Sequence, residues 1–238
     1  MYIKLTNGIV YDPVHGINGE HRDIYINDGQ ITRKPSSNTK ICKTYDMKGK
    51  IIMAGAIDIH THIGGGKVNI ARMMLPEDHA NDLVERTELT RSGCGNAAPS
   101  TLTAGYRYAE MGYTACFEPA MLPSNARQTH MEMGDTPMVD KGAYAMLGSD
   151  DFFLRMLASK KDQAAISDYV GWTINATQAL GIKVVNPGGI SAFKFNQRKL
   201  ELDELNQYYG VSPRDIIKSL ARAVTELGIP HPLHVHGC

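Results

Sequence analysis

Two histidines separated by one residue stand in a position where they could bind a metal ion. His60 and His62 belong to an alternating apolar pattern that predicts a buried strand over residues 56–63. Side chains two positions apart on a strand share a face, so Asp58, His60 and His62 are expected to point the same way. Imidazole is a common metal ligand. The alternative is a pair of histidines that only form hydrogen bonds at the end of a strand.

A lysine between two phenylalanines is the second candidate. Lys194 follows a predicted tight turn at residues 186–189 and is expected at the end of a strand. Burial lowers the pKa of a lysine, and the neutral amine can add carbon dioxide to form a carbamate, an anionic ligand able to bridge two metal ions. A lysine whose amine reaches water from a strand end is the plainer alternative.

A second His-x-His pattern stands close to the last residue. His234 and His236 lie in a predicted strand over residues 233–236 and would share one face, with His231 just before them. At most one or two of these three side chains are expected to bind metal.

Composition excludes several classes of function. The 238 residues include 25 basic and 25 acidic side chains and no basic run, so binding to nucleic acid or to a membrane surface has no electrostatic support. No apolar stretch is long enough to span a membrane. The first residues are too polar for a secretory signal. The four cysteines form no Cys-x-x-Cys pair, which predicts reduced thiols and a cytoplasmic protein.

The order of the predicted elements changes after residue 52. Before it, turn signals at Asn7-Gly8 and at residues 27–29 predict two hairpins in a small β layer. After it, predicted helices at 101–111, 164–180 and 213–227 are each followed by a short apolar strand, which indicates a parallel α/β sheet or barrel. Residues 64–100 are expected to form a long loop directly after the first histidine pair, where such folds place function.

The order of the candidate ligands resembles that of the amidohydrolase superfamily. Its binuclear members place His-x-His after the first barrel strand, a carboxylated lysine on a middle strand and a histidine on a later one. The resemblance implies an α/β fold: a β-sandwich portion at residues 1–52, then the first part of a TIM-type, metal-dependent hydrolase (β/α)₈ barrel at residues 53–238. About five strands fit in that second range, too few to close a barrel.

Several longer motifs resemble a narrower family, the A subunits of formylmethanofuran dehydrogenase and of the bacterial formyltransferase/hydrolase complex. These motifs are SGCGNAAPST at 92–101, EPAM at 118–121, VVNPGG at 184–189, AFKF at 192–195 and PLHVH at 232–236. The resemblance runs over nearly the whole chain. It implies hydrolysis of N-formylmethanofuran to formate and methanofuran in tetrahydromethanopterin-linked one-carbon metabolism, with other subunits of such a complex as partners.

Carried over to this sequence, the family's metal ligands would be His60, His62, Lys194 and His236. His234 and Asp58 are further candidates, either as ligands or as groups that support the ligands. The resemblance implies two divalent ions, zinc first, with carboxylated Lys194 as the bridge; iron, nickel or manganese would also suit these ligands.

Members of that family are longer than this chain. The aspartate that moves the proton in the superfamily would lie beyond residue 238, so we expect the 238 residues alone to be a fragment without activity. Two other functions compete. A cyclic amidase of the dihydropyrimidinase or dihydroorotase type shares the ligand order but lacks the motifs at 92–101 and 184–189. A non-catalytic scaffold protein within a multi-subunit complex would contain no metal.

Overall fold

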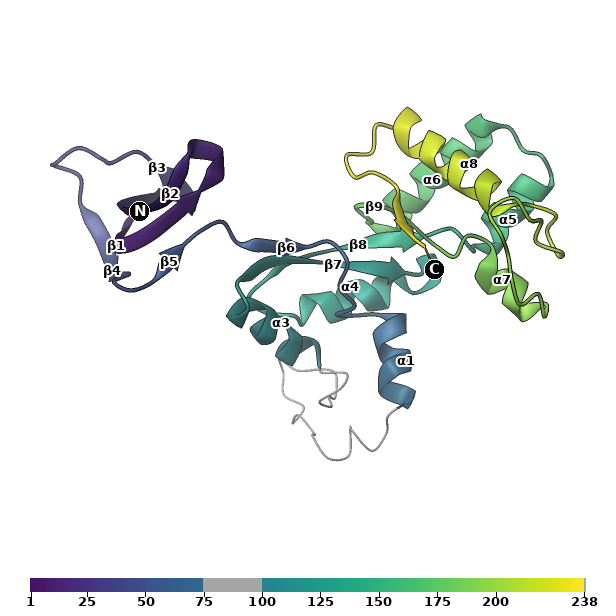
Figure 1. Cartoon of the computed structure of the whole chain (residues 1–238), viewed down its shortest axis with the longest axis horizontal. Coiled ribbons are helices and arrows are strands. Elements are labelled where there is room, and N and C mark those ends of the chain that lie inside the picture. The colour runs from purple at the N-terminus through teal and green to yellow at the C-terminus, as the bar shows by residue number, and fades with distance from the viewer. Residues whose placement is uncertain (75–99, 238) are drawn as a thin grey trace. The chain divides into compact units, whose positions relative to one another are not determined.

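The computed structural model describes residues 1–74 and 100–237, and the chain divides into two compact units (Figure 1). The first unit is Met1–Gly55 and the second is Ala56–Cys238. Among the described helices, none has the length and apolar character needed to cross a membrane. Each unit is described below by itself.

The first unit is one mixed β-sheet with the strand order β3-β2-β1-β4, in which β5 also pairs with β1. Strands β1, β2 and β3 are antiparallel, whereas β4 and β5 run parallel to β1. The elements are β1 (Tyr2–Asp12), η1 (Pro13–His15), β2 (Ile17–Asn27), β3 (Gln30–Thr32), β4 (Ile41–Asp46) and β5 (Ile51–Ile52).

One of the two predicted hairpin turns is wrong. Strand β1 continues through Asn7 and Gly8, and its register with β2 shifts there, as in a β-bulge. Asn7 has a φ of 64°, which an asparagine tolerates in a bulge as well as in a turn. A Cβ on Gly8 would lie 2.4 Å from Cδ1 of Ile52, so the glycine lets β5 approach β1. The second predicted hairpin is confirmed, because Asn27 pairs with Gln30 across its turn.

The second unit is built on a five-stranded sheet with the order β10-β9-β8-β7-β6. Every neighbouring pair is parallel, which confirms the predicted α/β class and the partial barrel. The strands are β6 (Ala56–Asp58), β7 (Tyr113–Met121), β8 (Asp140–Met146), β9 (Gly181–Val185) and β10 (His234–His236).

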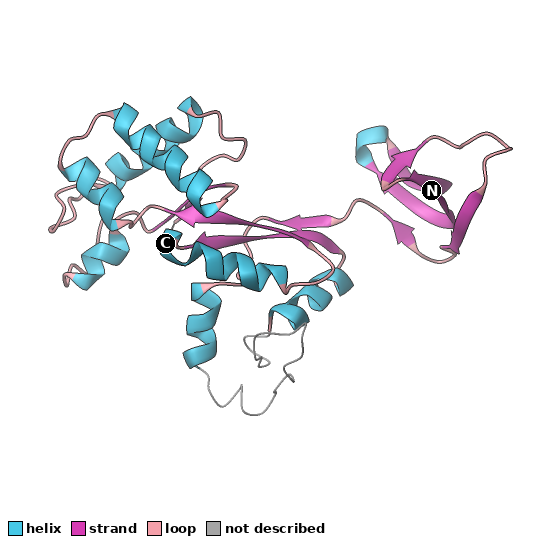
Figure 2. Cartoon of the chain, turned by 180° about the vertical axis from the view of Figure 1, so that it is seen from behind, coloured by secondary structure: helices cyan, strands magenta, loops and turns pink. Residues whose placement is uncertain are grey.

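Helices connect these strands, and Figure 2 shows them in cyan around the magenta strands. They are α1 (Gly66–Met74), α3 (Thr101–Glu110), η2 (Pro123–Asn125), α4 (Ala126–Gly134), α5 (Asp151–Ala158), α6 (Gln163–Thr177), α7 (Gly189–Lys194) and α8 (Pro213–Glu226). Helix α8 begins as its sequence predicts, with Pro213 in the first turn and a reciprocal capping box between Ser212 and Asp215.

Parts of two sequence predictions lie outside the described residues. The predicted loop over 64–100 begins with helix α1, and its remainder from residue 75 is not described. The same holds for the motif at 92–101 up to residue 99. Of the four cysteines, Cys42 and Cys116 are free, while Cys94 and Cys238 lie outside the described residues.

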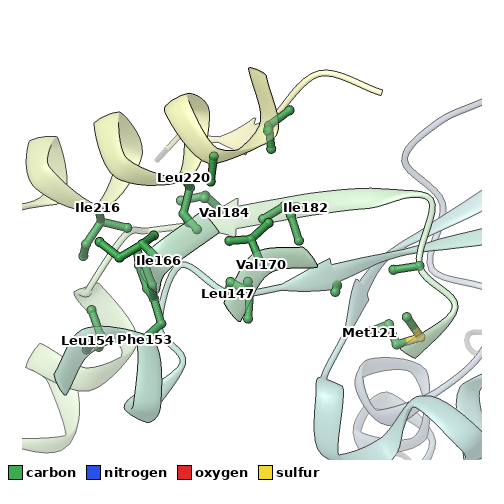
Figure 3. Close-up of a cluster of buried hydrophobic side chains, with 14 of the residues drawn as sticks. Met121, Leu147, Phe153, Leu154, Ile166, Val170, Ile182, Val184, Ile216 and Leu220 are labelled. Carbon is green, nitrogen blue, oxygen red and sulfur yellow. The ribbon is translucent and has the colours of Figure 1, made fainter. Parts of the chain in front are cut away.

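The core of the second unit lies between β9 and the helices α6 and α8. Ile182 and Val184 are fully buried and pack with Ile216 and Leu220 of α8, as Figure 3 shows. Residues on a strand alternate between its two faces, so Lys183 projects from the opposite face of β9. Packing of the helices on one face thus directs this lysine to the other.

Candidate metal centre

Four histidine side chains lie together at the carboxyl ends of the parallel strands. The ring centroid of His60 is 5.5 Å from that of His62, 5.0 Å from that of His234 and 5.1 Å from that of His236. The Nδ1 atom of His60 is 3.0 Å from the Nε2 atom of His234. The sequence prediction that the two His-x-His patterns contribute to one site therefore agrees with this arrangement.

The contact between His60 and His234 also indicates the shape of the sheet. Strands β6 and β10 are its two edges, yet the histidine that follows β6 touches the first histidine of β10. The sheet is therefore curled, so that its edges approach each other as they do in a barrel. The concave face holds the polar side chains, and the helices pack on the other face.

His60 and His62 lie in a loop and not in the predicted strand over 56–63, because β6 ends at Asp58. One oxygen of Asp58 accepts a hydrogen bond from the backbone N–H of His60 at 2.9 Å. The other accepts from the Tyr108 hydroxyl at 3.2 Å, and that hydroxyl also forms a short hydrogen bond with Thr61. The sequence predicts Asp58 as a ligand or a supporting group, and here both of its oxygens serve to fix the histidine loop.

Lys183 is a functional group that the sequence patterns do not single out. Its side chain is fully buried on β9, and its Nζ atom is 3.2 Å from Nδ1 of His60. Burial lowers the pKa of this amine to about 8, although the charge of Glu118 acts in the opposite direction. A buried lysine with a lowered pKa is a nucleophile at neutral pH. The available signal was a single charged residue inside an otherwise apolar strand, Gly181–Val185.

Lys194 lies elsewhere, and the strand predicted for it is wrong. It is the last residue of helix α7 and is exposed, as are Phe193 and Phe195 on either side. Gly188 has a φ of 73° and precedes this short helix, so the glycines that predicted a tight turn instead begin a helical turn. In the described part of the chain, no hydrogen bond joins Lys194 to the four histidines.

Glu118 is a second group that sequence reasoning did not single out as functional. Its carboxylate is buried on β7, and Oε1 is 3.0 Å from Nδ1 of His62. Oε2 accepts from the backbone N–H of Ile63 at 3.0 Å and of Gly64 at 3.4 Å. When Nδ1–H of His62 donates to this carboxylate, its Nε2 atom stays unprotonated and free to bind a metal ion.

Burial and a nearby charge lower the pKa values of two of the histidines, His60 and His234. Burial, followed by the nearby Lys183, lowers the pKa of His234 to about 4. The same two causes, in the same order, lower the pKa of His60. Strand pairing places His234 opposite Lys183 and His236 opposite Val185, so His236 lies one step nearer the carboxyl edge of the sheet.

A cavity of about 170 Å³ opens between these groups, and the sequence-predicted ligands His60, His62 and His236 line it. Lys183 and Lys67 line it as well. Within the described residues, no three histidine, cysteine, aspartate or glutamate side chains are arranged to hold a metal ion on their own. Lys183, which also lines the cavity, is a further side chain that could contribute a ligand there.

The chemistry of the donor set fits divalent metal ions. The lowered pKa values of His60 and His234 keep these two imidazoles unprotonated at neutral pH, as metal ligands must be. With a pKa of about 8, the amine of Lys183 is neutral in a larger fraction of molecules at neutral pH than the amine of an ordinary lysine. Glu118 supplies the outer hydrogen bond that such histidine ligands commonly make.

Comparison with known proteins identifies the fold and the relatives of this chain. A family model described as "Amidohydrolase family" matches residues 43–237. The chain is 41% identical over 232 residues to Protein FwdA of Methanocaldococcus jannaschii, and the match covers 98% of this chain and 40% of that protein. It is 39% identical over 236 residues to the A subunit of the formyltransferase/hydrolase complex Fhc of Methylorubrum extorquens, covering 99% of this chain and 42% of the relative.

A solved structure shows the same relationship. The crystal structure of the formyltransferase/hydrolase complex (FhcABCD) from Methylorubrum extorquens with methylofuran contains a chain that superposes with a TM-score of 0.85 at 39% identity. The superposition covers 99% of this chain and 42% of that one. This chain therefore spans about two fifths of the length of the relatives it matches.

Proposed function

The chain belongs to the amidohydrolase family, and we propose that it carries metal-binding residues of a hydrolase that cleaves a formyl amide. The observation that supports this proposal is the fully buried amine of Lys183, 3.2 Å from His60 in a cluster of four histidines. One solved relative is a formyltransferase/hydrolase complex with methylofuran. Together with the sequence resemblance, this suggests the substrate that we propose: an N-formylmethanofuran type of molecule, giving formate and the free amine.

We choose the proposed ligands from the side chains that line the small cavity. His60 and His62 would hold one divalent ion from the loop after β6, and His236 a second ion from β10. Lys183, in place of Lys194, would bridge the two as a carbamate. His234 contacts His60 and is paired with Lys183 across β10 and β9. It is therefore the alternative to His236 as a ligand of the second ion. Zinc is the first choice, since histidine and carboxylate oxygen suit it.

Formation of the carbamate requires only carbon dioxide and a proton acceptor. The lone pair of the neutral Lys183 amine attacks the carbon of carbon dioxide and forms an N–C bond, while one C–O π bond breaks and its electron pair stays on the oxygen. One proton then leaves the nitrogen for water. The product is an anion with two oxygens. Burial favours the neutral amine that this reaction requires. In the bound state, the metal ions would neutralise the charge that burial otherwise penalises.

The residues of this chain then have separate tasks. When bound, the divalent ions would lower the pKa of a water molecule and polarise the formyl oxygen. Glu118 holds the ring of His62 in one tautomer, and Asp58 fixes the backbone of His60. The superfamily gives proton transfer to the leaving amine to an aspartate, and we assign this task to none of the side chains described here.

The relatives also point to an assembly. The solved relative belongs to a complex with other proteins, so we propose that the protein containing this chain works with partner subunits of the same kind. The motifs at 118–121 and 184–189 contribute directly to the site region, since Glu118 contacts His62 and Val185 lines the cavity. The motif at 184–189, which the cyclic amidases are expected to lack, favours this function over a cyclic amidase.

The test is metal content combined with product analysis on the protein that contains this chain. We expect two divalent ions per chain by elemental analysis and release of formate from a formylated methanofuran. Lys183→Met should lose metal and activity, whereas the exposed Lys161→Met should keep both. Carbon-13 bicarbonate should give a carbamate resonance in the wild type and in Lys161→Met, and none in Lys183→Met.

Three results would contradict the proposal. Full metal loading in Lys183→Met would remove the bridging role of this lysine. Ring opening of dihydroorotate or dihydrouracil without formate release would indicate the cyclic amidase. A wild-type protein without bound metal and without activity would leave the scaffold function.

A further inference from the structure

Three consecutive glycines at 64–66 follow the first histidine pair, and the proposed function gives them no task. They let helix α4 pack directly against the backbone. A Cβ on Gly65 would lie 2.5 Å from Oγ1 of Thr129, and a Cβ on Gly66 would lie 2.7 Å from Nδ2 of Asn125, the residue before α4. Gly65 also has a φ of 89°, a conformation that favours glycine. The glycines are therefore required where α4 contacts the segment after the two histidines.

Glu132 of α4 binds this segment through both of its carboxylate oxygens. Oε2 accepts from the backbone N–H of Gly65 at 2.7 Å, and Oε1 accepts from the side-chain amide of Asn69 at 2.7 Å. Gln128, one turn earlier on α4, also donates to Oε1, at 3.2 Å. Because Asn69 belongs to α1, one carboxylate connects α4 both to the glycine segment and to the helix that follows it.

Most backbone N–H groups of the histidine loop, residues 60–65, donate to carboxylates. The acceptors, in chain order, are Asp58 for His60, the carbonyl of Phe117 for Thr61, Glu118 for Ile63 and Gly64, and Glu132 for Gly65. A buried N–H group that loses its acceptor destabilises the conformation that buries it. Since Gly65 is buried, the end of this loop depends on Glu132.

We infer that Glu132 is a positioning residue for the candidate metal centre, because it fixes the end of the loop that carries His60 and His62. That these histidines bind metal rests on the proposed function. A loop that is already ordered binds an ion more tightly, since less conformational freedom is lost on binding. Glu118 acts on the ring of His62 directly, whereas Glu132 acts on the backbone that follows it.

The pattern of donors and acceptors predicts that a second substitution rescues the first. In Glu132→Gln, the amide oxygen can accept from Gly65, but the NH₂ group then faces the NH₂ group of Asn69. In the double variant Asn69→Asp/Glu132→Gln, the same NH₂ group donates to the new carboxylate at position 69. Both hydrogen bonds therefore form again, with the acid and the amide exchanged.

The experiment uses two probes on the protein that contains this chain. Titration with cobalt(II) gives the affinity of the centre, and the visible absorption of the bound ion reports its ligand geometry. Hydrogen exchange at the amide of Gly65, measured without metal, reports the loop alone. Two controls separate other causes. Met131→Gly weakens α4 at an exposed position, and Glu110→Gln removes an exposed carboxylate at the end of α3.

We expect Glu132→Gln to bind cobalt about threefold to tenfold more weakly, the effect of one lost hydrogen bond on the order of the loop. Its cobalt spectrum should change, and the amide of Gly65 should exchange faster. The double variant should recover all three properties. Met131→Gly should lower the thermal midpoint and keep the affinity and spectrum of the wild type, and Glu110→Gln should change none of these.

Wild-type affinity and spectrum in Glu132→Gln would overturn the inference, as would an equal loss in Met131→Gly or a double variant without recovery. A wild type that binds no cobalt would contradict the proposed function. The exchange rate at Gly65 then decides by itself whether Glu132 holds the loop: an unchanged rate in Glu132→Gln would refute it.

Discussion

The carboxylate of Glu118 accepts hydrogen bonds from His62 and from the backbone of Ile63, Gly64 and Ala120. One buried side chain thus fixes both the ring of a candidate ligand and the loop that carries it. Glutamine has the same shape, but its NH₂ group cannot accept a hydrogen bond. Replacement therefore leaves at least one of these donors without a partner.

Glu118→Gln is expected to lower metal affinity about tenfold to a hundredfold, because outer hydrogen bonds set the orientation and tautomer of histidine ligands. Zinc titration with a competing chelator measures this change. Glu110→Gln is the control, since Glu110 is exposed at the end of α3. Equal affinities in the two variants would show that Glu118 does not act on the metal centre.

The histidine cluster also predicts how stability depends on pH. Burial lowers the pKa of His234 from its ordinary value of 6.5 to about 4. Between these values the unfolded chain binds a proton that the folded chain does not, so the free energy of unfolding decreases as the pH falls through this window. His60, whose pKa is also lowered, acts in the same direction.

Urea unfolding of the metal-free protein at pH 7.5, 6.5 and 5.0 tests this dependence. We expect stability to fall toward pH 5.0, and His234→Gln to show a smaller fall than the wild type. His21→Gln, at an exposed position on β2, should behave as the wild type does. If the free energy of unfolding of His234→Gln fell with pH as steeply as that of the wild type, His234 would not be the group that resists protonation.

At the scale of elements, helix α3 supports the histidine loop from outside the sheet. The hydroxyl of Tyr108 donates to Asp58 and is hydrogen-bonded to Thr61, which is buried between the two histidines of the loop. Its ring packs against that of Tyr113 at 5.1 Å between centroids. The first residue of β7 and the last turn of α3 therefore act together on one loop.

Tyr108→Phe keeps the ring packing and removes only the hydroxyl. The buried Thr61 hydroxyl and one Asp58 oxygen then lose a partner, which is expected to cost about 1–2 kcal/mol of unfolding free energy. Hydrogen exchange at the amide of Thr61 should accelerate in parallel. Tyr106→Phe, on the exposed face of the same helix, should change neither quantity; a similar loss in both variants would refute the role of Tyr108.

The same elements show what could be predicted from the sequence. The strands and helices after residue 100 follow largely from apolar periodicity and capping, as the box at Ser212 and Asp215 illustrates. The two His-x-His patterns can be found because their spacing is local. Which lysine lies beside these histidines depends on how the sheet curls, and the periodicity of the sequence does not predict that curvature.

Lys183 and Lys194 illustrate this limit of prediction from the sequence. The Phe-Lys-Phe pattern around Lys194 has the period of a strand, but Gly188 begins helix α7 and leaves both phenylalanines exposed. Lys183 lies within a strand whose apolar neighbours predict it correctly, and its charge is the exception there. A charged side chain at the centre of a buried strand is rare and requires an explanation. Applied to the sequence, this rule would have singled out Lys183.

At the scale of the whole second unit, the candidate ligands come from opposite edges of the sheet. His60 and His62 follow the edge strand β6, Lys183 lies on β9, and His236 on the other edge strand, β10. An ion held by these groups would connect segments more than 170 positions apart in the sequence, as His60 and His234 already do. Binding to the folded state alone would stabilise the unit by about 2.7 kcal/mol at a free metal concentration 100 times Kd.

Zinc is therefore expected to raise the thermal unfolding midpoint of the second unit, and EDTA to reverse the rise. The single tryptophan of the chain, Trp172, lies on α6, so its fluorescence reports this unit and not the first. His60→Ala should abolish most of the zinc-dependent shift because it removes a ligand at one edge, whereas His21→Ala should retain it. If zinc raised the midpoint equally in both variants, the ion would bind outside the histidine cluster and would not join the two edges of the sheet.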